Sequence, residues 1–194
     1  MSIKSRKVGI IGVGNVGSHV AFSIVTRGIC DELVLIDIKE DKVKSEMLDL
    51  KDSLANLDSN MIIKSQDYSE LKDAEILVIA AGPLPRFEQT RLDTLDDGVK
   101  IIDNIMPKVL QSGFDGIILV ITNPCDVISH YVWKKSGFPK NRVIGTGTSL
   151  DSARFKRIMS DIMNIDPKSI QGYSLGEHGD SQMIPWSHMY IGGR

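Results

Sequence analysis

Three glycines at a spacing that suits phosphate binding lie near the start of the chain, in the segment Gly12-Val-Gly-Asn-Val-Gly17. In a turn from strand to helix, the first such glycine permits the tight turn and the second lets the backbone approach a pyrophosphate. The third allows close packing of helix on strand, and the helix N-terminus faces the phosphates. Taken alone, three glycines also fit an ordinary turn. In the nucleotide-binding interpretation, the contacts come from Gly12, Gly14, Asn15, Val16 and Gly17.

An acidic residue follows at the distance that a dinucleotide site needs. Asp37 ends the second apolar run, 20 residues beyond Gly17. A carboxylate there can accept hydrogen bonds from the hydroxyls of a ribose, and it would repel a 2′-phosphate. The pattern therefore favours NAD over NADP as the cofactor. The alternative is a solvated carboxylate at the end of a strand, with no ligand.

Three further segments carry side chains that can do chemistry. Asn123 follows an apolar run and precedes a proline, Asp151 and Arg154 are three residues apart, and His178 lies between two glycines. The Asp-Arg spacing places both side chains on one face of a helix. Each segment also has an ordinary structural interpretation, namely a turn, a surface ion pair and a structural histidine.

The elements that must position these residues alternate between short apolar runs and helical patterns. Continuously apolar, β-branched runs are typical of parallel strands that are covered on both faces. Apolar residues recur at steps of three and four over 43–57 and 92–109, and those of residues 15–27 lie on almost every face of a helix, which predicts three helices. Pro107 should kink or split the second patterned helix. The predicted strands are Val8–Gly12, Leu33–Asp37, Met61–Ile63, Ile76–Ala80, Ile117–Ile121 and Val143–Gly145.

This alternation predicts an α/β fold, a doubly wound parallel sheet with right-handed crossovers. Six strands match a complete dinucleotide-binding sheet of the Rossmann type. After about residue 146 the pattern changes, and a helix opens near Asp151. We therefore expect a cofactor domain over residues 1–145 and the beginning of an α+β substrate domain over residues 146–194.

Composition excludes several classes of protein. The 194 residues include 23 Lys and Arg against 25 Asp and Glu, a net charge of −2 that lacks the basic excess of a nucleic-acid binder. No apolar run approaches the roughly 18 residues that span a bilayer. Two cysteines, Cys30 and Cys125, are too few for a disulfide scaffold and lack metal-ligand spacing, so we expect no metal and a cytoplasmic protein with reduced thiols.

Taken together, the motifs resemble the L-lactate/L-malate dehydrogenase family. The resemblance is closest to its L-2-hydroxy-acid branch, which includes lactate and L-2-hydroxyisocaproate dehydrogenases, and it covers essentially all 194 residues. The segments that carry it are Gly12–Gly17, Ala81-Gly82, Thr90–Asp93, Thr122–Pro124, Gly145–Arg154 and Gly176–Ser181.

The resemblance implies a reversible hydride transfer between NADH and a 2-oxo acid. His178 would be the acid/base residue, since an imidazole titrates near neutral pH, and Asp151 would orient it and stabilise its charged form. Arg154 would bind the substrate carboxylate through two parallel hydrogen bonds. Arg91 would lie on a loop that closes over the substrate, and it would polarise the reacting carbonyl.

Further site residues follow from the same resemblance. Asn123 would bind the reacting oxygen and the cofactor, while Tyr68, Ala81 and Gly82 would line the path of the adenine and the nicotinamide. The position that selects the substrate side chain is Pro85, where lactate enzymes usually have Gln and malate enzymes Arg. Proline supplies no charge for the second carboxylate of oxaloacetate, which favours pyruvate or a branched 2-oxo acid such as 2-oxoisocaproate. Arg86 keeps malate dehydrogenase as an alternative if the alignment is shifted by one residue.

Two other functions compete with this hypothesis. Relative to the family, the sequence ends shortly after His178, so the chain is expected to lack part of its pocket and to be a catalytically incompetent NAD-binding fragment with little turnover. A purely structural or interaction protein would have no need of Arg91, Asp151, Arg154 and His178 together. Members of the family form dimers or tetramers, so the resemblance also implies a homo-oligomer for the full-length protein, with a small carboxylic acid as its ligand.

Overall fold

The computed structural model describes residues 5–83 and 94–193. The chain divides into two compact units, Met1–Ile144 and Gly145–Arg194. The assignment of a cofactor domain to residues 1–145 and of a substrate domain to residues 146–194 stays a prediction.

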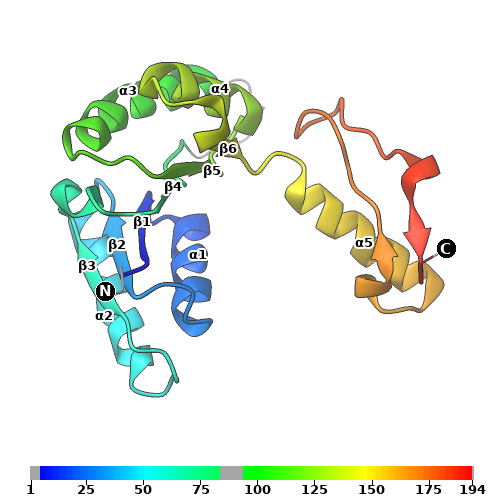
Figure 1. The fold of residues 1–194 in the computed structure, drawn as a ribbon, viewed down its shortest axis with the longest axis horizontal. Coiled ribbons are helices and arrows are strands. Elements are labelled where there is room, and N and C mark those ends of the chain that lie inside the picture. Colours follow the sequence, from blue (N-terminus) through cyan, green and yellow to red (C-terminus); the bar gives the residue numbers. More distant parts are fainter. Residues whose placement is uncertain (1–4, 84–93, 194) are drawn as a thin grey trace. The chain divides into compact units, whose positions relative to one another are not determined.

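The first unit is built on a six-stranded sheet whose strand order is β3-β2-β1-β4-β5-β6 (Figure 1). The ladders from β3 through to β5 are all parallel. The order reverses direction between β1 and β4, and ligands bind at such a switch point in open α/β sheets. The strands are β1 (Lys7–Ile11), β2 (Glu32–Ile36), β3 (Ile62–Ser65), β4 (Ile76–Ile79), β5 (Ile117–Val120) and β6 (Val143–Gly145).

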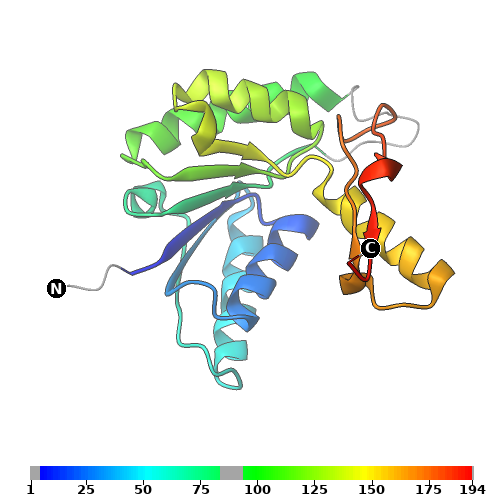
Figure 2. The same ribbon diagram turned by 45° about the vertical axis from the view of Figure 1, so that its right-hand side comes forward.

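Helices cover both faces of this sheet, as the strand–helix alternation predicted. α1 (Asn15–Thr26) and α2 (Glu40–Leu54) pack on one face, and α3 (Leu95–Gln111) and α4 (Cys125–Ser136) pack on the other (Figures 1 and 2). The doubly wound fold is thereby confirmed. Short 3₁₀ turns at Tyr68–Leu71 and Lys140–Arg142 complete the connections.

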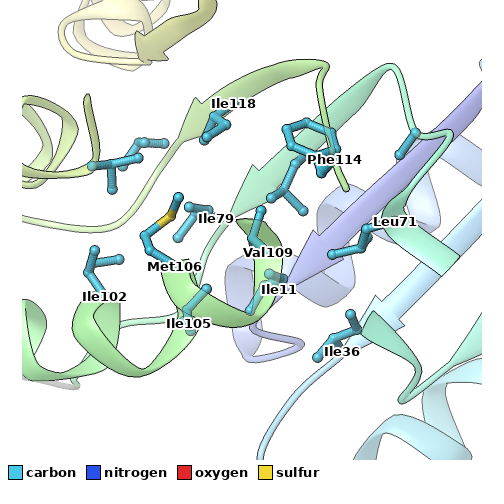
Figure 3. Close-up of a cluster of buried hydrophobic side chains, with 14 of the residues drawn as sticks. Ile11, Ile36, Leu71, Ile79, Ile102, Ile105, Met106, Val109, Phe114 and Ile118 are labelled. Carbon is cyan, nitrogen blue, oxygen red and sulfur yellow. The ribbon is translucent and has the colours of Figure 1, made fainter. Parts of the chain in front are cut away.

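Alternate residues of the central strands belong to two separate hydrophobic cores. Ile11 faces the core beneath α3 and α4, whereas Val8 and Ile10 face the core beneath α1 and α2. Figure 3 shows the first core, where Ile79, Met106 and neighbouring side chains interlock between sheet and helix. Burial on both faces explains why the strands are continuously apolar in sequence. The packing of these cores fixes where each strand ends, and hence where its loop begins.

The prediction that Pro107 would split its helix is wrong. α3 continues unbroken from Leu95 to Gln111 with Pro107 inside it. Ile105, Met106 and Val109 are buried on either side of the proline. Burying three such side chains contributes several kcal/mol, which outweighs the cost of about 3 kcal/mol for an interior proline. Leu92, which was expected to begin this apolar stripe, lies outside the described residues.

The second unit is a helix with a small antiparallel sheet. α5 (Ser149–Met163) is followed by a 3₁₀ turn at Pro167–Ser169, and β7 (Ile170–Gln171) pairs with β8 (Tyr190–Ile191) after a second 3₁₀ turn at Trp186–His188. Phe155, on α5, is buried and meets the ring of Trp186 edge-on at a centroid distance of 5.7 Å. Between the two strands the chain forms a hairpin that is closed by an antiparallel bridge between Leu175 and Met183.

The described residues contain neither a candidate membrane-spanning helix nor a candidate metal-binding cluster. None of their helices combines the length and the apolar character that a membrane span needs. Over residues 5–83 and 94–193, no cluster of three or more His, Cys, Asp or Glu side chains is arranged to hold a metal ion.

Candidate active site

The glycine-rich turn connects β1 to α1, and two of its glycines are required by packing. Gly12 has a positive φ of 95°, and a Cβ on it would collide with the backbone of Ala81. A Cβ on Gly17 would collide with the carbonyl oxygen of Gly12. These two positions therefore exclude any side chain, because neighbouring main chain occupies the space.

Gly14 is different, because it borders open space. A Cβ built on this residue has no protein atom within 4 Å. Gly14 is also the N-cap of α1. Among the described residues, the first turn of α1 contains no acidic residue, and no side chain makes a capping hydrogen bond there. The partial positive charge of a helix N-terminus thus faces an open place beside Asn15 and Val16, which are both exposed. This arrangement fits the diphosphate of a dinucleotide.

Asp37 lies directly beside the glycine turn. Its Oδ2 accepts a hydrogen bond of 2.7 Å from the backbone N–H of Val13, and its Oδ1 accepts one of 3.0 Å from the backbone N–H of Lys39. A carboxylate offers about four acceptor positions, so two backbone bonds leave capacity for ribose hydroxyls. The hydrogen bond to Val13 ties the end of β2 to the glycine turn, which the sequence spacing alone did not predict.

Other predicted cofactor residues lie at the same edge of the sheet. Ala81 follows β4 and contacts the glycine turn, and its carbonyl accepts a hydrogen bond of 2.8 Å from Oγ1 of Thr122. A Cβ on Gly82 would lie 2.6 Å from Cγ2 of Thr122, so the ends of β4 and β5 are closely packed. Asn123 comes next, is exposed, and precedes Pro124 through a cis peptide bond.

Tyr68 begins the 3₁₀ turn after β3 and is half-buried. Burial raises the pKa of its hydroxyl, and the negative charge of Asp37 raises it further. Tyr68 therefore belongs to the same neighbourhood as Asp37. Two predicted residues, Pro85 and Arg91, lie outside the described residues, as does Arg86.

In the second unit, the structure brings His178 and Asp151 together. Nδ1 of His178 lies 2.5 Å from Oδ2 of Asp151, and each side chain is only about a tenth exposed, at 10% and 11%. Asp151 lies in the first turn of α5, whereas His178 lies on the hairpin between Leu175 and Met183. A carboxylate on Nδ1 fixes the orientation of the imidazole and leaves its Nε2 as the nitrogen that is free for another partner.

Arg154 lies on the same face of α5 as Asp151, as the three-residue spacing predicted. Its Nη1 is 3.4 Å from Oδ1 of Asp151, and its side chain is 56% exposed. The long contact and the exposure leave most of the guanidinium in water. Arg154 is thus able to bind a carboxylate from solution while it stays next to the His178–Asp151 pair.

Four polar residues that sequence reasoning missed join the hairpin to α5. Thr148 Oγ1 donates to the carbonyl of Ser174 at 2.6 Å, and the N–H of Ser174 donates to Ser152 Oγ at 2.9 Å. Ser174 Oγ in turn donates to Oε1 of Gln182 at 3.0 Å, across the hairpin. The only signal in the sequence is a pair of hydroxyl residues, four apart, on either side of Asp151. We call Thr148, Ser152, Ser174 and Gln182 the hairpin clamp.

Comparison with known proteins gives one consistent family. Residues 6–145 match the family model of the lactate/malate dehydrogenase NAD binding domain, and residues 148–194 match that of the lactate/malate dehydrogenase alpha/beta C-terminal domain. Over all 194 residues the chain is 50% identical to L-lactate dehydrogenase 3 of Bacillus cereus and 43% identical to L-lactate dehydrogenase 2 of Lactococcus lactis. It spans 61% and 62% of the lengths of these two relatives.

Solved structures agree with this result. The ligand-bound crystal structure of the minor L-lactate dehydrogenase from Enterococcus mundtii has a TM-score of 0.95 and 42% sequence identity. A lactate dehydrogenase from a deep-sea metagenome library has a TM-score of 0.93 and 41% identity. Each similarity covers 99% of this chain and 61% of the other chain.

Proposed function

This chain belongs to the lactate/malate dehydrogenase family, as its motifs predicted, and on that premise we propose that it is an NAD-dependent L-2-hydroxy-acid dehydrogenase. The reaction would be a reversible hydride transfer between NADH and a 2-oxo acid. The observation that carries the proposal is the His178–Asp151 pair beside the exposed guanidinium of Arg154. These three groups meet the needs of a substrate that has one carboxylate and one carbonyl to be protonated.

The cofactor would occupy the edge of the sheet at the glycine turn. The open space at Gly14 suits the diphosphate, and Asp37 suits the adenine ribose. The proposed contacts come from Gly12, Gly14, Asn15, Val16, Gly17, Asp37, Tyr68, Ala81, Gly82 and Asn123. When bound, the reduced nicotinamide supplies the hydride that reaches the carbonyl carbon of the substrate.

The protein would supply the proton and hold the substrate. Because Nδ1 of His178 pairs with Asp151, proton exchange with the substrate oxygen would take place at Nε2. Asp151 would orient the imidazole that donates this proton. Arg154 would bind the substrate carboxylate, and Arg91 would polarise the carbonyl as a loop closes. His178, Asp151 and Arg91 are therefore the proposed catalytic residues.

The substrate would be pyruvate or a branched 2-oxo acid. The L-lactate dehydrogenases named above support this choice over the malate alternative. At the specificity position, Pro85 gives no charge to the second carboxylate of oxaloacetate. We propose Arg154, Asn123, Arg91 and Pro85 as the substrate-binding residues.

Several wider features belong to the same proposal. Residues 1–145 would form the NAD-binding domain, and residues 146–194 the N-terminal part of the substrate domain. The protein would be cytoplasmic, consistent with the buried thiols of Cys30 and Cys125. It would form a dimer or a tetramer, which light scattering after size-exclusion chromatography would measure.

A second candidate is NADH binding without turnover, since the glycine turn and Asp37 of the first unit suffice to form a cofactor site. One set of assays separates the two candidates. NADH binding is measured by fluorescence titration of the wild type and of Asp37→Ser, and we expect weaker binding in the variant. Oxidation of NADH is then compared with pyruvate, 2-oxoisocaproate and oxaloacetate.

Turnover that is highest with pyruvate or 2-oxoisocaproate supports the dehydrogenase proposal. Binding without turnover supports the second candidate. Highest kcat/KM for oxaloacetate would overturn the substrate assignment, and an unchanged NADH affinity in Asp37→Ser would overturn the cofactor assignment.

A further inference from the structure

Gln66 adopts a backbone conformation that its residue type disfavours. Its φ is +64°, in the left-handed region, directly after the end of β3. Among the described residues that are not glycine, Asn164 alone shares a positive φ, at 52°. Such a conformation is strained for a residue other than glycine, and it persists only where the surrounding structure enforces it. The contacts of Gln66 show what enforces it.

The side-chain amide of Gln66 makes two hydrogen bonds to the backbone of one residue, Asp37. Oε1 accepts from the N–H of Asp37 at 3.1 Å, and Nε2 donates to the carbonyl of Asp37 at 2.8 Å. The N–H of Gln66 itself donates to the carbonyl of Leu35 at 2.9 Å. These three bonds account for the left-handed turn, because it aims the amide at β2.

This arrangement extends the sheet by means of a side chain. The ladder between β2 and β3 ends at the pair Leu35–Ser65. Beyond it, the amide of Gln66 bonds the N–H and the carbonyl of Asp37, as the main chain of a neighbouring strand would do. The backbone of Asp37 is therefore held in line with β2, although the strand itself ends at Ile36.

The carboxylate of Asp37 is held from the opposite side by the glycine turn, through the N–H of Val13. A continuous path of hydrogen bonds thus runs from Gln66 through Asp37 to Val13. Loss of the amide would free the backbone of Asp37 and let its carboxylate occupy a wider range of positions. The hydrogen bonds from the N–H groups of Val13 and Lys39 would not replace the lost contacts, because they hold the carboxylate and not the backbone of Asp37.

We propose that Gln66 is a positioning residue for Asp37, and that it thereby strengthens the preference for NADH over NADPH. This proposal rests on the proposed role of Asp37 at the adenine ribose. The amide acts only through Asp37, so it should alter selectivity rather than binding in general. A residue with a purely structural role would weaken the binding of both cofactors equally.

Gln66→Gly is the informative variant, because glycine accepts a positive φ and the change removes only the side-chain bonds. We expect the NADH Kd to rise about tenfold, the order expected for losing two hydrogen bonds that position a charged group, while the NADPH Kd changes less than about twofold. Asn164→Gly is the matched control, because it changes the other non-glycine residue with a positive φ. Both Kd values should stay unchanged in that control, and circular dichroism should show that all variants fold.

Two further measurements test the route through Asp37. In the Asp37→Ala background, Gln66→Gly should have no additional effect on the NADH Kd. In the absence of any ligand, Gln66→Gly should speed hydrogen exchange of the Asp37 amide, which loses its acceptor. The proposal would be overturned by an equal loss of affinity for NADH and NADPH, by additive effects of the two substitutions on the NADH Kd, or by an unchanged hydrogen-exchange rate of the Asp37 amide.

The outcomes also separate this inference from the function on which it rests. If Asp37→Ala weakens NADH binding and Gln66→Gly does not, the positioning role fails and the proposed NAD site stands. If Asp37→Ala leaves NADH binding unchanged, the ribose contact fails, and the selectivity role of Gln66 fails with it.

Discussion

Nδ1 of His178 and Oδ2 of Asp151 are 2.5 Å apart, although 27 residues separate them in the chain. The contact joins the first turn of α5 to the tip of a hairpin, and both side chains are largely shielded from water. A carboxylate that is largely shielded from water needs a hydrogen-bond partner within the protein, and the imidazole supplies one. The pair therefore ties the position of a candidate acid/base group to the packing of the hairpin on α5.

Replacing Asp151 by Asn keeps the shape of the side chain and removes its charge. We expect NADH oxidation with a 2-oxo acid to fall by about 100-fold or more, because an amide no longer holds the imidazole of His178 in the tautomer that acts at Nε2. The NADH Kd should stay within about twofold of the wild type. Stopped-flow rates with pyruvate and fluorescence titration with NADH measure the two quantities. Normal turnover in the variant would show that the pair is not catalytic.

Ser152→Ala tests the hairpin clamp. The change removes the acceptor for the N–H of Ser174, a buried residue, which should cost about 1–3 kcal/mol locally and lower turnover about tenfold. Hydrogen exchange at the Ser174 amide should become faster. Ser160→Ala is the matched control. Ser160 lies at the far end of α5, where its Oγ donates a hydrogen bond to the backbone carbonyl of Ile165. A rate loss as large in Ser160→Ala would assign the effect to general loss of stability.

Arg154→Lys tests the binding of the substrate carboxylate. Lysine keeps the positive charge but cannot form two parallel hydrogen bonds, so the KM for the 2-oxo acid should rise about 10-fold or more. Arg157→Lys, one turn along the same helix, serves as the control because Arg157 pairs with Asp161 at 2.8 Å. Steady-state kinetics at saturating NADH give both KM values. Equal KM values in Arg154→Lys and the wild type would contradict the assignment.

Gly14→Ala should lose affinity for NADH, whereas Gly17→Ala should lose stability. A methyl group on Gly14 meets no protein atom within 4 Å, so this variant should fold normally and yet bind NADH at least about tenfold more weakly. A methyl group on Gly17 collides with the carbonyl of Gly12, so that variant should lose stability. Thermal unfolding and NADH titration separate the two effects. If Gly14→Ala binds NADH with wild-type affinity, the diphosphate does not bind at Gly14.

The stability of the first unit should depend on pH through Glu70. Lys64 Nζ lies 2.7 Å from Oε2 of Glu70, and this hydrogen bond lowers the pKa of the carboxyl, with Lys7 contributing at 3.4 Å. Because the folded pKa lies below the unfolded value, the stabilisation is complete above the ordinary pKa. It is lost as the pH falls from about 4.5 through the lower folded pKa.

Urea unfolding at pH 7 and near pH 3 checks this dependence. Glu70→Gln should destabilise the protein by about 1 kcal/mol at pH 7, and the difference from the wild type should shrink in acid. Asp52→Asn, at an exposed position of α2, provides the comparison. A difference that stays constant or grows in acid would contradict the role of Glu70.

The six strands and three of the helices that cover them, α1, α2 and α3, could be predicted because their signals are local, whereas α4 was not predicted. Most strands of the sheet are apolar runs, and the predicted limits differ from the observed ones by at most two residues, as for Met61–Ile63 against Ile62–Ser65. Pro107 shows the limit of such local rules, since buried neighbours kept α3 intact. The spacing of Asp151 and Arg154 placed them correctly on one helix face. Gln66 and the hairpin clamp gave no comparable signal, because their partners are distant in sequence.

Apolar periodicity and motif spacing act over a few residues, so the fold class, the glycine turn and the family could be predicted from the order of the residues. Which groups meet follows from the folded chain: His178 with Asp151, Gln66 with Asp37, and Ser174 with Ser152. The folded chain also distinguishes Gly14, which borders open space, from Gly12 and Gly17, which are enclosed by main chain. Such contacts depend on how strands, hairpins and helices pack, and packing is set by the whole core rather than by any short segment.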